Sequence, residues 1–141
     1  MKRTANAQWR GDLKTGAGNI STASGVLSGT PYSFHTRFED GTGTNPEELL
    51  AAAHAGCFTM ALSAQLAAAG LTAESLETAC SISLEKVADS FAITESHLDL
   101  KAKVPGATQD AFDKAVKAAE TGCPVSKLYK AKITVTSTLQ Q

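Results

Sequence analysis

Three cysteines carry the reactive chemistry available to this 141-residue chain, and two of them stand out by their surroundings. Cys57 lies in an alanine-rich helical run, AAAHAGCFTMAL, where small neighbours leave room beside the sulfur. Cys123 lies at a helix-ending signal, ETGCPVSK. Two thiols that meet in a folded protein can run a redox cycle that one thiol alone cannot complete. We therefore expect the function to involve Cys57 and Cys123.

Each cysteine also has a plain structural interpretation, because free cysteine is among the most buried residue types. Cys80 fits that interpretation, since it occupies the apolar side of an alternating segment. A short helical turn after Cys123 would direct backbone N–H groups at its sulfur and favour the thiolate. The alternative is that Cys123 is an inert thiol in a chain reversal. His54, three residues before Cys57 on the same helical face, either tunes that thiol or simply packs.

The sequence motifs give less support to metal binding, serine hydrolysis or nucleotide binding. The spacing His54-x-x-Cys57 is half of a zinc site, but no Cys-x-x-Cys supplies the other half, and His35 and His97 are scattered. The Gly-x-Ser-x-Gly motif of serine hydrolases is absent. The glycines near residue 17 fit no dinucleotide or phosphate fingerprint. The sequence therefore favours thiol chemistry without a metal.

The composition narrows the class of protein. Thirteen Lys and Arg against 14 Asp and Glu give a net charge of −1. This near balance does not indicate a basic surface for binding nucleic acid or a polybasic patch for binding a membrane. The apolar run over 49–69 carries His54, Thr59, Ser63 and Gln65, so it is a poor transmembrane candidate. The basic N-terminus, MKRTANAQWRGD, has no apolar run behind it. Together with an odd number of cysteines, these features predict a reduced, cytoplasmic protein.

The first half of the chain predicts strands followed by one long helix. Up to residue 40, turns punctuate short extended segments, and the alternation of residues 32–38 predicts a strand with Arg37 on its polar side. A helix follows over 46–69, with Thr44 or Asn45 as cap. We expect most of its circumference to be buried, and a break near residues 55–56 stays an open alternative.

The second half predicts two strands, a helix and a final strand. Residues 76–86 and 91–104 alternate and read as a hairpin, with His97 facing outward and Leu98 inward. A helix over 109–121 and a strand over 132–139 complete an α+β chain that we expect to form one domain, residues 1–141.

Four short motifs, in this order along the chain, resemble those of the osmotically inducible protein C and organic hydroperoxide resistance (OsmC/Ohr) family. The likeness extends over essentially the whole chain and is greatest to the OsmC branch. It implies an OsmC-like α+β fold, with antiparallel sheets around a long central helix, in an intertwined homodimer with two active sites at the subunit interface. The motifs are TRFE at 36–39, TNPEEL at 44–49, AHAGCF at 53–58 and GCPVS at 122–126.

The resemblance also implies an activity. Family members are thiol peroxidases that reduce organic hydroperoxides, and hydrogen peroxide less well, to alcohols and water in oxidative and osmotic stress. By this likeness Cys57 attacks the peroxide and becomes a sulfenic acid, Cys123 resolves it to a disulfide, and Arg37 and Glu47 are the polar partners. The family uses no metal or haem cofactor. An external dithiol, such as a lipoylated protein, is the expected reductant.

Elementary chemistry agrees with these roles. A thiol with a pKa of about 8.5 is only slightly ionised at neutral pH, so a guanidinium near Cys57 would help to form the thiolate. Arg37 keeps its charge at any pH, and Glu47 could hold it by a two-point carboxylate pair. Ten residues of helix separate Glu47 from Cys57, about 15 Å. Either the helix breaks or another subunit supplies one of the groups, and we expect a shared dimer interface.

Two alternatives from other classes stay open. A small-ligand or acyl-group binding protein could keep the fold without turnover. A redox sensor could form the same disulfide but recycle poorly. For a peroxidase, the apolar residues Leu49, Phe58 and Met60 predict a pocket suited to alkyl or lipid hydroperoxides.

Overall fold

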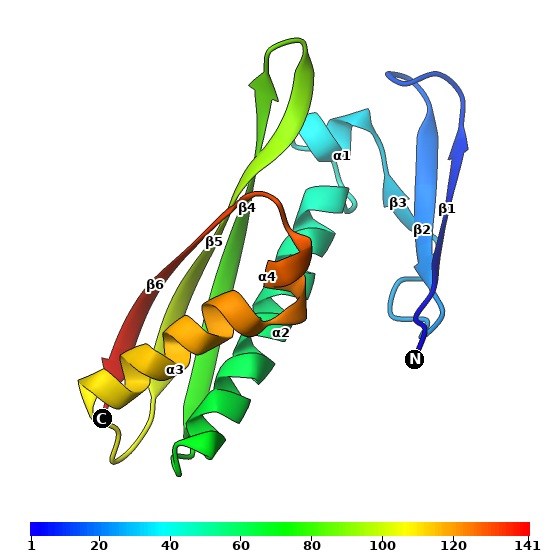
Figure 1. Cartoon of the computed structure of the whole chain (residues 1–141). Coiled ribbons are helices and arrows are strands. Elements are labelled where there is room, and N and C mark those ends of the chain that lie inside the picture. Colours follow the sequence, from blue (N-terminus) through cyan, green and yellow to red (C-terminus); the bar gives the residue numbers. More distant parts are fainter. The chain divides into compact units, whose positions relative to one another are not determined.

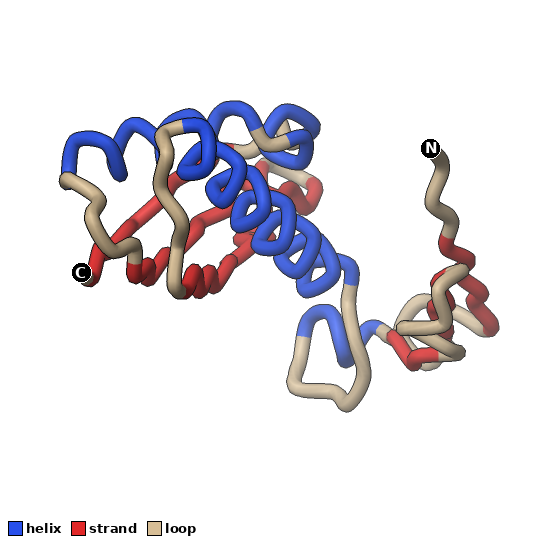
Figure 2. Tube along the Cα trace, turned by 90° about the horizontal axis from the view of Figure 1, so that it is seen from below, coloured by secondary structure: helices blue, strands red, loops and turns tan.

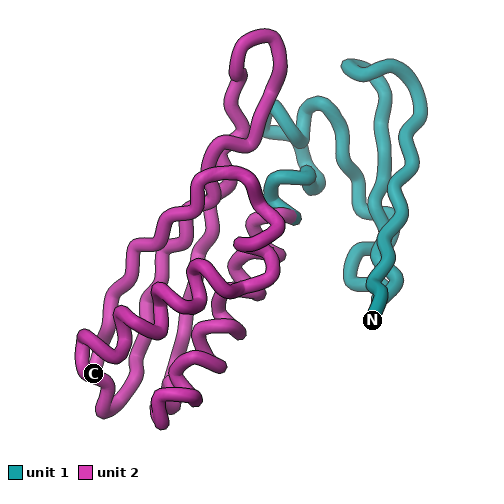
Figure 3. Tube along the Cα trace, in the orientation of Figure 1, with its two compact units in different colours: residues 1–49 teal, residues 50–141 magenta.

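The computed structural model describes all 141 residues and divides them into two compact units, residues 1–49 and residues 50–141 (Figure 3). The division falls in the first turn of the longest helix, α2 (Pro46–Ala68). Each unit has its own three-stranded sheet. The α+β class expected from the sequence is confirmed.

The first unit is built on an antiparallel sheet of β1 (Ala5–Arg10), β2 (Ala17–Thr22) and β3 (Thr30–Tyr32), in that order (Figure 1). The strands pair with their sequence neighbours, as short turns between them allow. The early strands and turns were therefore correctly predicted. Helix α1 (Phe34–Phe38) follows β3 directly.

The strand expected over residues 32–38 is wrong, because most of that segment forms α1. The Ser33 hydroxyl accepts a hydrogen bond from the Thr36 backbone N–H, and the Ser33 N–H donates to Thr36 Oγ1. This reciprocal capping box favours a helical turn and competes with the extended form that the alternation predicts. Arg37 consequently lies in the last turn of a short helix.

The second unit contains a mixed sheet of β4 (Ser75–Val87), β5 (Ser90–Lys103) and β6 (Lys132–Gln140). β4 and β5 form the expected antiparallel hairpin, but β6 runs parallel to β5. The expectation of purely antiparallel sheets is therefore wrong here. Helices α3 (Gln109–Gly122) and α4 (Pro124–Leu128) make the crossover that a parallel pair requires.

The core of the second unit lies between its sheet and its helices, which cover one face of that sheet (Figures 1 and 2). Leu98 and Leu100 point inward from β5 while Asp99 points outward, as the alternation predicted. Helix α3 confirms the helix expected over 109–121 and buries Phe112, Ala115, Val116 and Ala119 on one side. The fully buried apolar side chains of this core are Phe58, Leu62, Leu66, Leu98, Leu100, Val104, Phe112, Ala119 and Cys123.

Helix α2 is continuous, so the alternative of a break near residues 55–56 is wrong. Asn45 Oδ1 accepts from the Glu48 N–H at its start, and Gly70, at φ +74°, follows its end. Contrary to expectation, α2 buries little of its circumference in the single chain: Phe58 is buried, whereas Met60 is 78 % exposed. The helix is long and apolar enough to cross a membrane, a property that core helices of soluble proteins share.

Candidate active site

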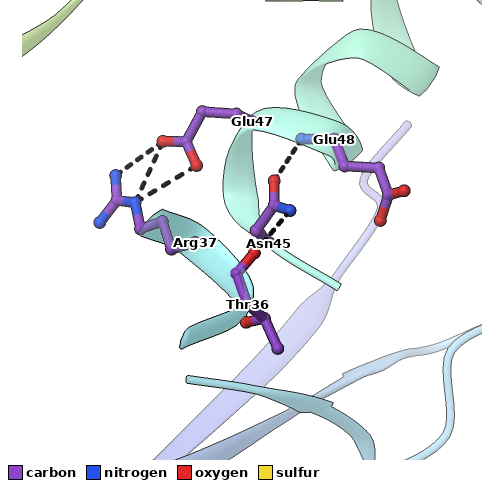
Figure 4. Close-up of polar contacts among 5 residues, drawn as sticks. All are labelled: Thr36, Arg37, Asn45, Glu47 and Glu48. Atoms are coloured by element: carbon purple, nitrogen blue, oxygen red, sulfur yellow. Dashed lines mark hydrogen bonds and ion pairs between the residues drawn. The ribbon is translucent and has the colours of Figure 1, made fainter. Parts of the chain in front are cut away.

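The first unit holds a two-point ion pair between Arg37 and Glu47 (Figure 4). Arg37 Nε lies 3.1 and 3.2 Å from the two carboxylate oxygens, and Nη2 lies 2.8 Å from Oε1. The Glu47 side chain is 11 % exposed and that of Arg37 is 40 % exposed. The geometry is the carboxylate–guanidinium fork expected from the sequence, and it leaves the guanidinium partly accessible.

The loop between α1 and α2 folds back so that this pair can form. Asn45 Nδ2 donates to the Thr36 carbonyl oxygen at 3.0 Å while its Oδ1 caps α2 (Figure 4). Gly43 has φ +139°, and a Cβ on it would overlap the Pro31 carbonyl oxygen. A glycine is therefore required at this point of the loop. These contacts set Glu47, in the first turn of α2, opposite the last turn of α1.

A hollow in the first unit lies beside the guanidinium. Half of its lining residues are aromatic, and Trp9 and Tyr32 among them contact each other with ring centroids 5.5 Å apart. The Arg37 guanidinium also lies 5.5 Å from the Phe38 ring centroid, a cation–π distance. The residues that line the hollow are Trp9, Leu13, Tyr32, Ser33, Phe34, Arg37, Phe38 and Pro46.

The second unit holds all three thiols, none of them in a disulfide. Cys123 is fully buried and is the N-cap residue of α4, whose Ser126 N–H donates to the sulfur at 3.3 Å. The Cys123 thiol in turn donates to Ser126 Oγ at 3.2 Å. The short helical turn that the sequence left conditional is therefore present, and it directs a backbone N–H at the sulfur.

Cys57 and Cys123 interact directly through a hydrogen bond between their side chains. Burial raises the pKa of the Cys57 thiol, and the contact with Cys123 raises it further, while a backbone hydrogen bond with Val125 acts in the opposite direction. The structure thus brings the two cysteines together and, by itself, favours the neutral thiol at Cys57.

His54 lies at the centre of a buried cluster that sequence reasoning did not find. The ring is fully buried, with Nδ1 2.5 Å from Ser96 Oγ and Nε2 2.9 Å from Ser126 Oγ. The Tyr129 ring meets it edge-on at 5.1 Å. Burial lowers the pKa of His54, which favours the neutral imidazole. His54 therefore packs and also bonds to the helical turn that carries Cys123.

Cys80 packs against the core, as expected for a structural cysteine. Its sulfur also lies 3.3 Å from Ser96 Oγ. Burial raises the pKa of this thiol, and the hydrogen bond with Ser96 opposes the rise. Phe58, expected to line a pocket beside Cys57, is instead fully buried in the core.

The chain resembles known proteins along nearly its whole length. The model of the family described as OsmC-like protein matches residues 39–138. Peroxiredoxin OsmC of Escherichia coli (strain K12) is 50 % identical over 135 residues, which cover 96 % of this chain and 94 % of that protein. Peroxiredoxin OsmC of Shigella flexneri gives the same values. This agrees with the resemblance to the OsmC branch.

Solved structures share the fold. The organic hydroperoxide resistance protein OhrB of Bacillus subtilis has a TM-score of 0.68 and 27 % identity, covering 97 % of this chain and 98 % of that one. An OsmC-like protein of unknown function from Vibrio cholerae has a TM-score of 0.77 at 15 % identity, covering 98 % and 99 %. The second likeness concerns the fold alone.

Proposed function

The chain belongs to the OsmC-like protein family and is a cysteine-based hydroperoxide peroxidase, in which we propose that Cys57 attacks the peroxide and Cys123 resolves the product. The observation that carries these roles is the contact between the two free thiols. Thiols that share a hydrogen bond lie close enough to form a disulfide with little movement. Cys57 is also the less buried of the two, as suits the residue that meets the substrate.

The proposed cycle has three steps. The Cys57 thiolate attacks one oxygen of ROOH, the O–O bond breaks, and the alkoxide takes up a proton to leave as the alcohol. The sulfenic acid on Cys57 then condenses with the Cys123 thiol, which forms the disulfide and releases water. An external dithiol, such as a lipoylated protein, reduces the disulfide and restores both thiols.

Burial raises the pKa of Cys57, so a nearby cation would favour the thiolate that attacks the peroxide. The guanidinium of Arg37, oriented by Glu47, is the group we assign to this role. It would also donate hydrogen bonds to the departing alkoxide as charge develops. The aromatic hollow beside Arg37 supports a preference for apolar alkyl or aryl hydroperoxides.

A second copy of the chain is proposed to bring the two parts of the site together. Helix α2 is continuous, so the ten residues from Glu47 to Cys57 correspond to about 15 Å of helix rise. We infer that Arg37 and Glu47 of one protomer serve Cys57 of its partner in a homodimer. The exposed apolar face of α2, which includes Met60, supports burial against a partner. The whole chain then acts as a single functional domain, in the cytoplasm, where thiols stay reduced.

Mixed dimers test this sharing directly. Cys57→Ser and Arg37→Gln subunits, each inactive alone, are co-expressed with different tags and the mixed dimer is purified. Shared sites predict that one site of the mixed dimer is intact, so its activity is about half that of the wild type. If each chain supplies its own complete site, the mixed dimer stays inactive. A monomer in sedimentation together with full activity contradicts the proposal altogether.

The catalytic pair is tested by one equivalent of an organic hydroperoxide added to the reduced protein, followed by mass-spectrometric mapping of the thiols. We expect a rapid Cys57–Cys123 disulfide with Cys80 left free. Unreacted thiols at both positions would contradict the cycle and favour a ligand-binding protein. A disulfide that no dithiol reduces would instead favour a redox sensor.

A further inference from the structure

A continuous row of hydrogen bonds joins Cys123 to Cys80 through His54. The Cys123 thiol contacts Ser126 Oγ at 3.2 Å, and Ser126 Oγ lies 2.9 Å from His54 Nε2. On the other side, His54 Nδ1 lies 2.5 Å from Ser96 Oγ, which lies 3.3 Å from Cys80 Sγ. The row thus connects α4, α2, β5 and β4 within the second unit.

The row is shielded from water for most of its length. Cys123, His54 and Ser96 are fully buried and Ser126 is 7 % exposed. No buried side-chain polar atom of the chain lacks a hydrogen-bond partner. The Tyr129 phenol, at the C-terminal end of α4, meets the imidazole edge-on, and burial is the cause that lowers the pKa of His54, with no charged group contributing to the shift.

The row has two self-consistent hydrogen arrangements. When Cys123 is a thiol, it donates to Ser126, which donates to His54 Nε2, and Nδ1–H donates to Ser96. When Cys123 is a thiolate, the Ser126 hydroxyl turns to donate to the sulfur, Nε2–H donates to Ser126, and Ser96 donates to Nδ1. A neutral imidazole fits both arrangements by changing its tautomer, whereas burial opposes an imidazolium.

We propose that His54 is a positioning residue for the resolving step, because its exchange of tautomers lets Ser126 switch from accepting the Cys123 thiol proton to stabilising the Cys123 thiolate. The inference rests on the proposed function and deepens it. In that step the S–O bond of the Cys57 sulfenic acid breaks and the S–S bond forms. Cys57 is reduced and Cys123 is oxidised. The Cys123 proton passes to Ser126, the Ser126 proton to Nε2 and the Nδ1 proton to Ser96, whose own proton leaves toward the partly exposed Cys80 end, while the departing hydroxide takes up one proton from water and leaves as water.

His54→Gln and Ser126→Ala test the proposal, because an amide cannot exchange tautomers and alanine has no hydroxyl. Two rates are measured after mixing with a saturating organic hydroperoxide: sulfenic acid formation at Cys57, by trapping, and disulfide formation, by rapid quench and mass spectrometry. Ser126→Thr keeps the hydroxyl and is the rescue variant. Cys80→Ser keeps a hydrogen-bonding group at the far end of the row and is the matched control.

We expect sulfenic acid formation within about twofold of the wild type in all four variants. Disulfide formation should slow about tenfold or more in His54→Gln and Ser126→Ala, the loss associated with one hydrogen bond to a charged group. Its pH profile should move to higher pH in these two variants. Ser126→Thr and Cys80→Ser should stay near the wild-type rate.

Equal disulfide rates in the wild type, His54→Gln and Ser126→Ala would overturn the proposal. Equal slowing of both steps would also overturn it, because it would indicate a purely structural role. Failure of the proposed function is distinct from either result, since the wild type itself would then form no Cys57–Cys123 disulfide. If Ser126→Ala does not fold, the proposal is tested by comparing the rates of sulfenic acid formation and disulfide formation in His54→Gln with those in Cys80→Ser.

Discussion

Replacing Glu47 by glutamine isolates the role of the two-point ion pair. The substitution keeps the shape of the side chain but removes the charge and presents an NH₂ group where an oxygen accepts from Arg37 Nε. With the amide oxygen in the Oε1 position, the contacts with Nη2 at 2.8 Å and Nε at 3.1 Å can survive, but they lose the carboxylate charge, and the 3.2 Å contact of Nε with Oε2 is replaced by a donor facing a donor. The guanidinium should therefore lose its fixed orientation while the fold remains intact.

The size of the effect follows from the geometry. A hydrogen bond to a charged group contributes about 1.5–3 kcal/mol, and this must be discounted because the Arg37 side chain is 40 % exposed. A loss of about 1.4 kcal/mol in the transition state corresponds to about a tenfold slower reaction. We expect the second-order rate of Cys57 with an organic hydroperoxide to fall by about that factor.

The assay is stopped-flow mixing of the reduced protein with the hydroperoxide at several concentrations, with alkylation of residual Cys57 as a second readout. Glu39→Gln is the matched control, because Glu39 is a carboxylate of the same unit that pairs with His35 and is 56 % exposed. A Glu47→Gln rate equal to that of the wild type would refute the reasoning. Equal losses in Glu39→Gln would point to a general charge effect instead.

Three further outcomes are expected. Cys123→Ser should complete one turnover and then accumulate over-oxidised Cys57, seen by mass spectrometry; normal multi-turnover kinetics would disprove the resolving role. Phe112→Ala should lower the free energy of unfolding in urea by about 3–5 kcal/mol, whereas the exposed Val26→Ala should change it by less than about 0.5 kcal/mol. Because burial lowers the pKa of His54 from 6.5, the unfolded chain binds the proton first, so stability should decline as the pH falls below about 6.5. His54→Gln should weaken that decline in urea titrations, and an unchanged slope would contradict it.

The sequence predicted the parts of the fold where the spacing of apolar residues and the residues that cap helices indicate the same secondary structure. The hairpin of β4 and β5 follows from the alternation of its two strands, and α3 begins where the Thr108 side chain accepts from the Ala111 backbone N–H. The prediction failed at α1, where alternating apolar and polar residues indicated a strand but the Ser33–Thr36 capping box stabilises a helical turn. The parallel pairing of β6 is a long-range property of the crossover, so a local pattern does not reveal it.

The candidate site was predicted in part. Arg37 and Glu47 meet within one unit and Cys57 meets Cys123 within the other, as the proposed roles require. The polar partners of His54 were missed, because each comes from a different element. One signal was available: Ser96 stands on the inward-facing side of β5 in line with Leu98, where a polar residue needs a buried partner.

The positions of Cys57 and Cys123 in the chain make oxidation a change in topology. Both lie in the second unit, and a disulfide between them would close a 66-residue loop that contains the whole β4–β5 hairpin and α3. A loop of that length restricts the unfolded chain by about 4 kcal/mol at 25 °C. The oxidised enzyme, although it awaits its reductant, is then the form most resistant to unfolding. Peroxide would thus protect the scaffold while it consumes the reactive thiol.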